Sequence, residues 1–222
     1  MHEIMLTGRG PNTMTLESLS TFADELRAHR DSPILLFGEG TAFSAGLDLK
    51  ALATGDPRAV TEKIEEVVSE LFMHRAPTIA AVNGHAVAGG CLVAQACDLR
   101  IGTDDPNIKI GMTGVALGIT YPPVVLRLLR HRLPRHTIER VLLEADRYDP
   151  RSAMELGLLD EVVPDAIGAA RERLAKLAAY PRHAYAEAKH ALRAGALDVD
   201  AAERARFEEA AVEAWDPSRF SS

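Results

Sequence analysis

The chain has 222 residues, of which 47% are hydrophobic and 26% charged, and its formal net charge is −7. This composition suits one soluble domain with a full core, and the acidic balance argues against nucleic acid or an anionic membrane as the main partner, because both are bound through clustered cations. Neither a leader segment nor an apolar run of about 18 residues is visible, so we expect a cytoplasmic protein.

The first fifty residues predict a strand, a helix and a second strand. We expect a short strand over residues 3–7, a turn over residues 8–12, and a helix that Thr15 caps. The core face of this helix is predicted to consist of Leu16, Leu19, Phe22 and Leu26. A buried strand over residues 33–38 follows, and it leads into a loop of small residues at 42–50.

A turn-rich break at residues 53–57 precedes a longer helix, residues 58–74. Its apolar residues recur at helical spacing, and they are Ile64, Val67, Val68, Leu71 and Phe72. We interpret this stripe as a core face and not as a cofactor site.

The segment from residue 78 to residue 98 combines a strand, a glycine turn and a helix. Residues 78–82 are an apolar run, Gly89 and Gly90 follow, and an alanine-rich stretch with helical spacing continues from them. Glycine lets the backbone approach a ligand closely, and the first amides of a helix have no intrahelical partner. The Gly89 amide could therefore bind a negative oxygen. The alternative is that the glycine pair only lets the helix pack against the strand.

Two cysteines, Cys91 and Cys97, lie six residues apart on this apolar helix. Positions six apart on a helix face different directions, so we expect two buried free thiols and no disulfide. No pair of histidine, cysteine or acidic residues has the spacing of metal ligands, so no metal is expected.

The second half of the chain begins with short elements and ends with helices alone. We expect strands at 98–102, 108–111 and 158–163 and helices at 123–129, 134–144, 150–155, 166–179, 182–194 and 198–215. The helix at 150–155 is predicted to be capped by Asp149 and ended by Gly157. Because only helical patterns follow residue 165, we divide the chain into a core, residues 1–164, and a C-terminal helical subdomain, residues 165–222.

Three segments together resemble the enoyl-CoA hydratase/isomerase (crotonase) superfamily: FSAGLDLK, PTIAAVNGHAVAGGCLVAQACDLRIG and YDPRSAMELGLLDEVVP. The resemblance implies an α/β fold, a crotonase-like spiral of ββα units whose C-terminal helical subdomain serves oligomer contacts or closes over the ligand. It also implies an acyl-CoA thioester as the ligand, with CoA as part of the substrate and no separate cofactor. A homo-oligomer, a trimer or a hexamer, is the implied assembly.

The resemblance places two amides that bind the thioester oxygen at Leu47 and Gly89. Two fixed donors stabilise an enolate more than a neutral carbonyl group. The two glutamates that the family's hydratases use correspond to Leu92 and Gly114 here. Neither residue can activate water or protonate carbon, so hydration and double-bond isomerisation by the usual mechanism are not expected.

The loop MTGVALGITY resembles that of methylmalonyl-CoA decarboxylase, a superfamily member with a tyrosine at the place of Tyr121. Loss of CO2 from a malonyl-type thioester yields the enolate without a base, so an oxyanion site and a proton donor would suffice. The decarboxylase has a histidine at the place of Leu47, so the match is incomplete. The structural alternative for Tyr121 is a loop aromatic that packs its ring and hydrogen-bonds its hydroxyl group.

Further substrate contacts are predicted at Thr13, Ser44, Ala45, Asp48, Leu49, Gly90, Thr113 and Leu117. Asp48 has a structural alternative as a cap of the loop backbone, His85 is interpreted as a structural histidine, and Arg9 is either a ligand of a CoA phosphate or a solvated side chain. The function indicated is acyl-CoA binding with enolate stabilisation. The alternative from another class is a non-catalytic acyl-CoA-binding or assembly protein of the same fold.

Overall fold

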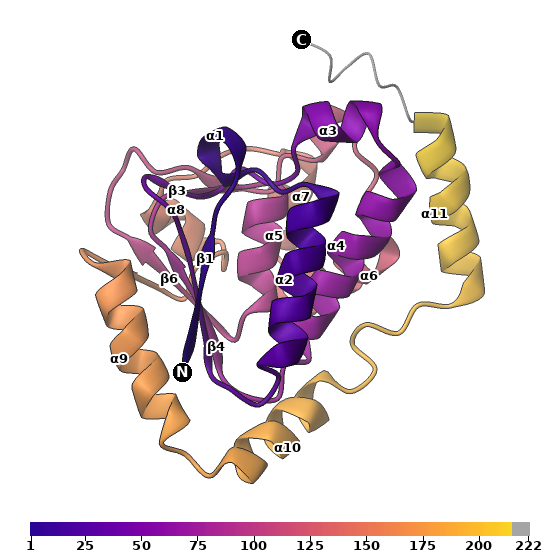
Figure 1. Cartoon of the computed structure of the whole chain (residues 1–222). Coiled ribbons are helices and arrows are strands. Elements are labelled where there is room, and N and C mark those ends of the chain that lie inside the picture. The colour runs from indigo at the N-terminus through magenta and orange to yellow at the C-terminus, as the bar shows by residue number, and fades with distance from the viewer. Residues whose placement is uncertain (215–222) are drawn as a thin grey trace.

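The computed structural model describes residues 1–214, and in this range parallel strands build two sheets that helices cover (Figure 1). The strands are β1 His2–Leu6, β2 Ile34–Gly38, β3 Ala42–Ser44, β4 Thr78–Val82, β5 His85–Val87, β6 Leu99–Thr103, β7 Ile110–Gly111 and β8 Glu161–Val163. The helices are α1 Arg9–Asn12, α2 Leu16–Ala28, α3 Leu49–Thr54, α4 Pro57–Phe72, α5 Gly89–Ala96, α6 Pro123–Arg132, α7 Ile138–Leu143, α8 Pro150–Glu155, α9 Ala166–Ala178, α10 Arg182–Arg193 and α11 Ala201–Ala214, with a 3-10 turn at Val115–Leu117. None of the helices within residues 1–214 combines the length and the apolar character needed to cross a bilayer.

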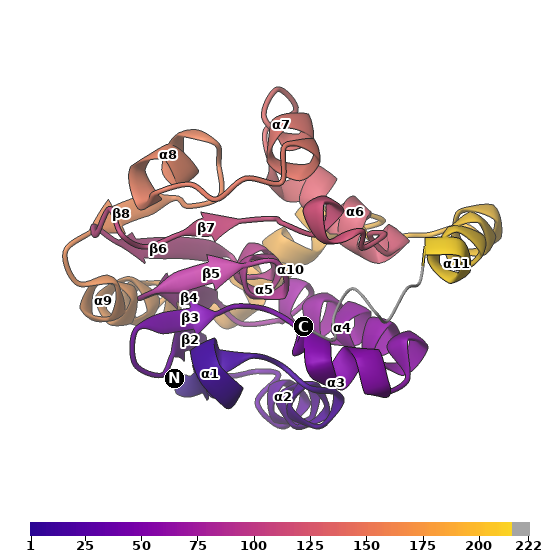
Figure 2. The same ribbon diagram turned by 90° about the horizontal axis from the view of Figure 1, so that it is seen from above.

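The chain winds as a spiral, and each of the three middle turns adds one strand to each sheet, whereas β1 and β8 belong to the larger sheet alone. The larger sheet has the order β1-β2-β4-β6-β8 and the smaller one β3-β5-β7, and every pairing is parallel. β2 continues into β3, β4 into β5 and β6 into β7, and helices close each turn, so successive turns stack on one another (Figure 2). The spiral of ββα units predicted from the sequence is therefore confirmed.

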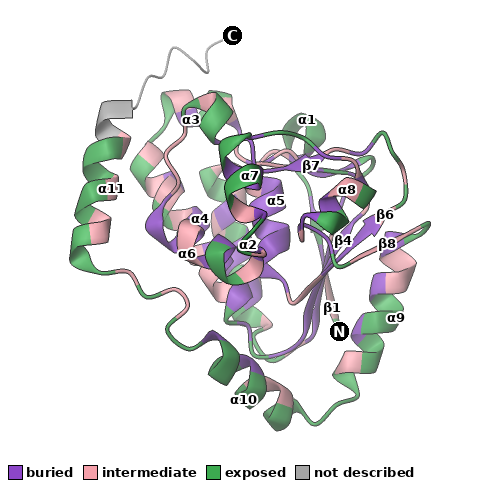
Figure 3. Ribbon diagram, turned by 180° about the vertical axis from the view of Figure 1, so that it is seen from behind, coloured by how far each residue is buried: buried purple, intermediate pink, exposed green. Residues whose placement is uncertain are grey.

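The larger sheet buries both of its faces. On one face Leu36 and Ala80 join the main core beneath α2, α4 and α5, and on the other Leu35 and Ile79 pack against α9, which contributes Ala166, Ala170 and Leu174. Continuous apolar strands are typical of parallel sheets covered on both sides. Buried residues accordingly concentrate in the strands and α5, whereas the C-terminal helices are mostly exposed (Figure 3). α9 follows the predicted boundary between residues 164 and 165, yet it packs directly on the sheet of the core. The division into two parts stays a prediction.

A buried carboxylate holds α10 against the core. Asp98, between α5 and β6, accepts hydrogen bonds from Tyr185 Oη at 2.8 Å, Lys189 Nζ at 2.9 Å and Arg193 Nη2 at 2.8 Å. These three residues recur every four positions and so share one face of α10. Removing one partner from such a buried group costs about 3–5 kcal/mol, so this cluster fixes the direction in which the C-terminal segment continues.

Two predicted loops contain regular structure. Ala42–Ser44 and His85–Val87 are strands β3 and β5, which pair with each other. The segment α1 is in its backbone angles a tight turn, as predicted for residues 8–12, because Gly10 and Pro11 have non-helical φ and ψ and Asn12 has a φ of 57°. A three-residue strand has no detectable periodicity of its own, and it becomes a strand only through its partner. The sequence pattern therefore missed two strands of the smaller sheet, on which the candidate site is built, whereas the third, β7, lies within the strand predicted over residues 108–111.

Other expectations hold with shifted limits. The predicted helix over 134–144 begins at Ile138, and the predicted strand over 158–163 begins at Glu161. Leu16, expected in the core, is 37% exposed because it is the first residue of α2. Cys91 and Cys97 are buried and unpaired, and burial raises the pKa of each thiol to about 12. The predicted helix end at residue 215 lies outside the described residues.

Candidate active site

Two glycine turns meet at the ends of β3 and β5. Gly46 adopts a positive φ of 90°, and a Cβ atom placed on it would lie 2.6 Å from the amide nitrogen of Gly89. A Cβ atom on Gly89 would in turn lie 3.4 Å from the amide nitrogen of Leu47. The two backbones therefore approach too closely for a side chain at Gly46, and the amides of Leu47 and Gly89 become neighbours.

A strained alanine precedes the second turn. Ala88 is the N-cap residue of α5 and adopts φ 50° and ψ −117°, a combination that costs a residue with a Cβ atom about 1–3 kcal/mol. Hydrogen bonds hold it there, because its amide donates to the Gly111 carbonyl at 2.8 Å and its carbonyl accepts from the Leu92 amide at 2.9 Å. Sequence analysis missed Ala88, because a positive φ is common for glycine and is not expected for alanine.

The amides of Leu47 and Gly89 have no acceptor in the described part of the chain, whereas their neighbours do. The Met14 amide donates to the Gly46 carbonyl and the Asp48 amide donates to the Met14 carbonyl, each at 2.8 Å, which pins the first turn beside α2. Leu47 and Gly89 are half-buried, and both line the same cavity. With the positive end of the α5 dipole behind Gly89, two unpaired donors so placed can bind one negatively charged oxygen.

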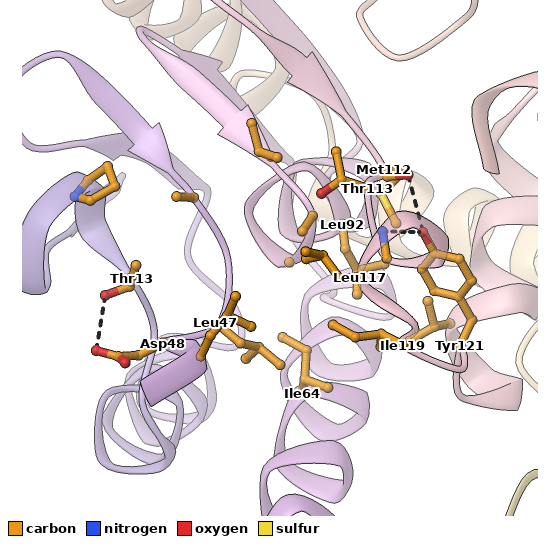
Figure 4. Close-up of a pocket in the computed structure, with 18 of the residues that line it drawn as sticks. Thr13, Leu47, Asp48, Ile64, Leu92, Met112, Thr113, Leu117, Ile119 and Tyr121 are labelled. Atoms are coloured by element: carbon orange, nitrogen blue, oxygen red, sulfur yellow. Dashed lines mark hydrogen bonds between the residues drawn. The ribbon is translucent and has the colours of Figure 1, made fainter. Parts of the chain in front are cut away.

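The cavity they face has a volume of about 810 Å³ and a largely apolar wall. Thr13 and Asp48 lie at one end of it and Tyr121 at the other (Figure 4). The wall between them is formed by Leu47, Ile64, Leu92, Met112, Leu117 and Ile119. A largely apolar wall of this kind can bind an aliphatic chain.

The charged groups of the cavity wall are mainly cations. Arg9, Lys50, Lys109 and Arg147 line it, and within residues 1–214 Asp48 is the one carboxylate that does. Asp48 is already engaged, because its side chain caps α3 by accepting from the Ala51 amide at 3.0 Å. The geometry thus favours the structural alternative for Asp48, a cap of the loop backbone. The cations make the cavity suited to an anionic ligand, although the net charge of the whole chain is negative.

Tyr121 fills the space beside Gly114. Its hydroxyl group accepts from the Gly114 amide at 3.1 Å and donates to the Met112 carbonyl at 3.3 Å. A Cβ atom on Gly114 would lie 2.9 Å from both Cζ and Oη of Tyr121, so the ring occupies the volume of any side chain at position 114. Burial raises the pKa of Tyr121 to about 12, and the phenol is therefore a neutral hydrogen-bond donor at physiological pH.

Most predicted site residues lie together. Those that line the cavity are Thr13, Ala45, Leu47, Asp48, Leu49, Gly89, Thr113, Leu117 and Tyr121. Arg9 also lines it, and His85 lies exposed on its rim, where its Nδ1 atom accepts from the Lys109 amide at 3.0 Å.

Ser44 and Gly90 do not line the cavity, and their role as substrate contacts stays a prediction. Ser44 is fully buried, and its hydroxyl group donates to the Asn12 carbonyl at 2.8 Å and accepts from the Gly46 amide at 3.1 Å. Gly90 lies against the Ser44 backbone with no room for a Cβ atom. Both residues fix the two turns from their buried side, away from the cavity.

Sequence analysis also missed Lys50, Lys109 and Arg147. Each is an unremarkable cation in its local sequence, and only the fold brings them to one cavity. Within the described range, no group of three or more histidine, cysteine or acidic residues could hold a metal ion.

Comparisons with known proteins agree on one family. The family model described as enoyl-CoA hydratase/isomerase matches residues 2–214. Mitochondrial enoyl-CoA delta isomerase 1 from Mus musculus is 31% identical over 197 residues, which are 84% of this chain and 68% of the relative. The crystal structure of human mitochondrial delta3-delta2-enoyl-CoA isomerase superposes with a TM-score of 0.87 at 26% identity, over 98% of this chain and 90% of that one. An enoyl-CoA hydratase/isomerase family protein from a Pseudomonas superposes with a TM-score of 0.83 at 27% identity, over 96% and 94% of the two chains.

The ring of Tyr121 and a side chain at position 114 would compete for the same space. Gly114 has a right-handed helical φ of −57°, so Gly114→Ala introduces no backbone strain and its cost, about 1–3 kcal/mol, measures the clash with Tyr121. Tyr121→Ala leaves a cavity and costs about 3–5 kcal/mol. In the double variant the clash is absent, so we expect the two losses to fall short of additivity by about 1–2 kcal/mol in urea unfolding. Strictly additive losses would show that the ring and position 114 do not compete for space.

Proposed function

We propose, because this chain belongs to the enoyl-CoA hydratase/isomerase family, that it binds an acyl-CoA thioester and stabilises the enolate of the acyl group. The observation that carries this proposal is the pair of unpartnered amides, Leu47 and Gly89, that face one apolar cavity. An enolate oxygen placed between them would receive two hydrogen bonds. Each such donor typically lowers a reaction barrier by about 2.7–4 kcal/mol.

The charge of the cavity supports a CoA ester as the ligand. Arg9, Lys50, Lys109 and Arg147 offer cations to the phosphates of CoA, and the apolar wall offers room for the acyl chain. The relatives, which are named enoyl-CoA isomerases and enoyl-CoA hydratase domain-containing proteins, support the same class of ligand. CoA would enter as part of the substrate, with no separate cofactor.

The reaction we propose is loss of CO2 from a 2-carboxyacyl-CoA thioester of the malonyl type. Leu92 and Gly114 supply no carboxylate, and Asp48 caps α3, so within residues 1–214 no free carboxylate of the cavity wall is available to abstract a proton from carbon. In decarboxylation the bond between Cα and the carboxylate breaks, and its electron pair forms the enolate whose oxygen the amides of Leu47 and Gly89 hold. An apolar wall raises the energy of the substrate carboxylate and not that of neutral CO2.

Tyr121 is the proton donor in this proposal. Its phenol gives a proton to Cα of the enolate, the thioester carbonyl re-forms, and water returns a proton to the phenolate. The long bond to the Met112 carbonyl, 3.3 Å, is the one that the hydroxyl group would give up, and the Gly114 amide would stabilise the phenolate.

A second candidate is a non-catalytic acyl-CoA-binding or assembly protein of the same fold. The hydroxyl group of Tyr121 favours this candidate, because both of its hydrogen bonds are made with backbone groups, as in a purely structural role. In either case we propose a homo-oligomer, a trimer or a hexamer, as the assembly, and sedimentation equilibrium of the purified chain measures it directly.

Turnover of a small panel of thioesters tests the proposed reaction. We expect the purified protein to release CO2 from methylmalonyl-CoA and to leave crotonyl-CoA and a 3-enoyl-CoA unchanged, as followed by mass spectrometry. Hydration of crotonyl-CoA, or a shifted double bond in the 3-enoyl-CoA, would contradict the assignment and require a carboxylate from elsewhere. Binding of the thioesters without any turnover would support the non-catalytic alternative.

Substitution of Gly46 tests the two amides, and Gly40 provides a matched control. Both glycines have a positive φ, 90° and 68°, so alanine strains each by about 1 kcal/mol. Only at Gly46 would the new methyl group meet the Gly89 amide, whereas nothing lies within 4 Å at Gly40. We expect Gly46→Ala to abolish turnover and weaken acyl-CoA binding, while Gly40→Ala keeps both. Equal activity of the two variants would rule out the amide pair as the oxyanion site.

The Tyr121→Phe variant tests the proton donor. We expect turnover to fall by about 10²-fold or more, with the dissociation constant of the acyl-CoA little changed. Because the pKa of Tyr121 is raised to about 12, the phenol keeps its proton, and the wild-type rate should be flat from about pH 7 to about pH 9.5. Full turnover by the variant would leave Tyr121 with its structural role alone.

A further inference from the structure

The first turn of α11 is attached to the core by ion pairs. Arg204 Nη1 lies 2.7 Å from Glu65 Oε2 on α4, and Glu203 Oε2 lies 2.8 Å from Arg127 Nη2 on α6. Asp200 caps the turn by accepting from the Glu203 amide at 2.8 Å. α11 runs beside α4 and α6, away from the sheets (Figures 1 and 2). The helix is therefore positioned at its beginning, between two helices of the core.

Ion pairs contribute more than apolar burial to holding α11 against the core. In residues 201–211, where its side chains are described, every residue is exposed or half-buried. The apolar residues that pack nearby, Ala196 and Leu197, belong to the segment that precedes the helix. The contacts of Arg204 and Glu203 thus account for most of what connects the described part of α11 to the core.

Glu65 has a second task, at the beginning of α6. It is a buried carboxylate with 9% of its side chain exposed, and its Oε1 atom accepts from the Val124 amide at 3.3 Å. α6 has prolines at its N-cap and first positions and no side-chain cap of its own. The first-turn amide of Val124 would otherwise lack a partner, so Glu65 caps α6 from a different helix.

The two helices that Glu65 joins both contribute to the cavity wall. Ile64, its neighbour on α4, lines the cavity, and so do Pro122 and Val125 on either side of the bond to Val124. Tyr121 stands just before α6 at the end of the cavity away from Thr13 and Asp48 (Figure 4). The bond between Glu65 and the Val124 amide therefore links the two walls, in addition to the core packing between α4 and α6.

We propose that Glu65 is a positioning residue that limits the length of the acyl chain in the cavity, and that Arg204 of α11 holds Glu65 in place. The proposal rests on the acyl-CoA binding proposed above. Without Arg204, the Glu65 carboxylate loses its counter-charge in a buried place, where an unpaired charge is unfavourable, and it turns toward water. The Val124 amide then loses its cap, the beginning of α6 moves away from α4, and longer acyl chains fit.

The test is the Arg204→Ala variant, with Arg206→Ala, an exposed arginine on the same helix, as the matched control. Calorimetry would measure the dissociation constants of CoA, butyryl-CoA, octanoyl-CoA and dodecanoyl-CoA. We expect Arg204→Ala to shift the preference toward dodecanoyl-CoA over butyryl-CoA by about fivefold, roughly 1 kcal/mol, and to leave CoA binding unchanged. Arg206→Ala should match the wild type. Glu65→Gln, which keeps an acceptor for Val124, should stay closer to the wild-type preference than Glu65→Ala.

Hydrogen exchange gives a readout that needs no ligand. We expect amides of residues 122–128 to exchange about tenfold faster in Arg204→Ala, as for the loss of one hydrogen bond, and at the wild-type rate in Arg206→Ala. Equal weakening of all thioesters, or an unchanged chain-length preference with unchanged exchange, overturns the proposal. If the wild type binds no CoA ester, the proposed function fails, and the exchange rates still decide whether α11 acts on α6.

Discussion

The contact between two backbone turns is the constraint on which the candidate site depends. Gly46 and Gly89 approach so closely that a Cβ atom on Gly46 would lie 2.6 Å from the Gly89 nitrogen. The amides of Leu47 and Gly89 thereby become neighbours, and both face the cavity without an acceptor in the described part of the chain. Unpaired amides are costly when buried, and here a ligand oxygen can take the place of the missing acceptor.

The spiral fold explains why these turns meet. β3 and β5 are parallel neighbours in the smaller sheet, so their carboxyl ends lie at the same edge, and each is followed by a turn. Ser44 and Gly90 fix the turns from the buried side, and the pairing of β5 with β7 holds Ala88 in its strained conformation. The surrounding structure thus determines the geometry of the amides before any ligand arrives, which is the condition for electrostatic stabilisation of an enolate.

The end of the cavity at Tyr121 is formed by side chains and not by backbone turns. There a tyrosine stands where a side chain at position 114 would be, and a buried carboxylate of α4 caps the helix that follows. Tyr121 and Glu65 both hydrogen-bond backbone groups there, so they define the shape of this end of the cavity.

The sequence by itself determined the features that depend on neighbours along the chain. The apolar runs of β2 and β4, the stripe of α4, the caps Thr15 and Asp149 and the two glycine turns are all local signals, and the structure has them. The tertiary structure alone decided which amides lack a partner, that Ser44 and Gly90 lie behind the cavity, that Lys109 and Arg147 reach its wall, and that Glu65 caps α6. The physical reason is that strand pairing, close approach and burial are relations between residues far apart in sequence, and no residue carries a local signal of its distant partner.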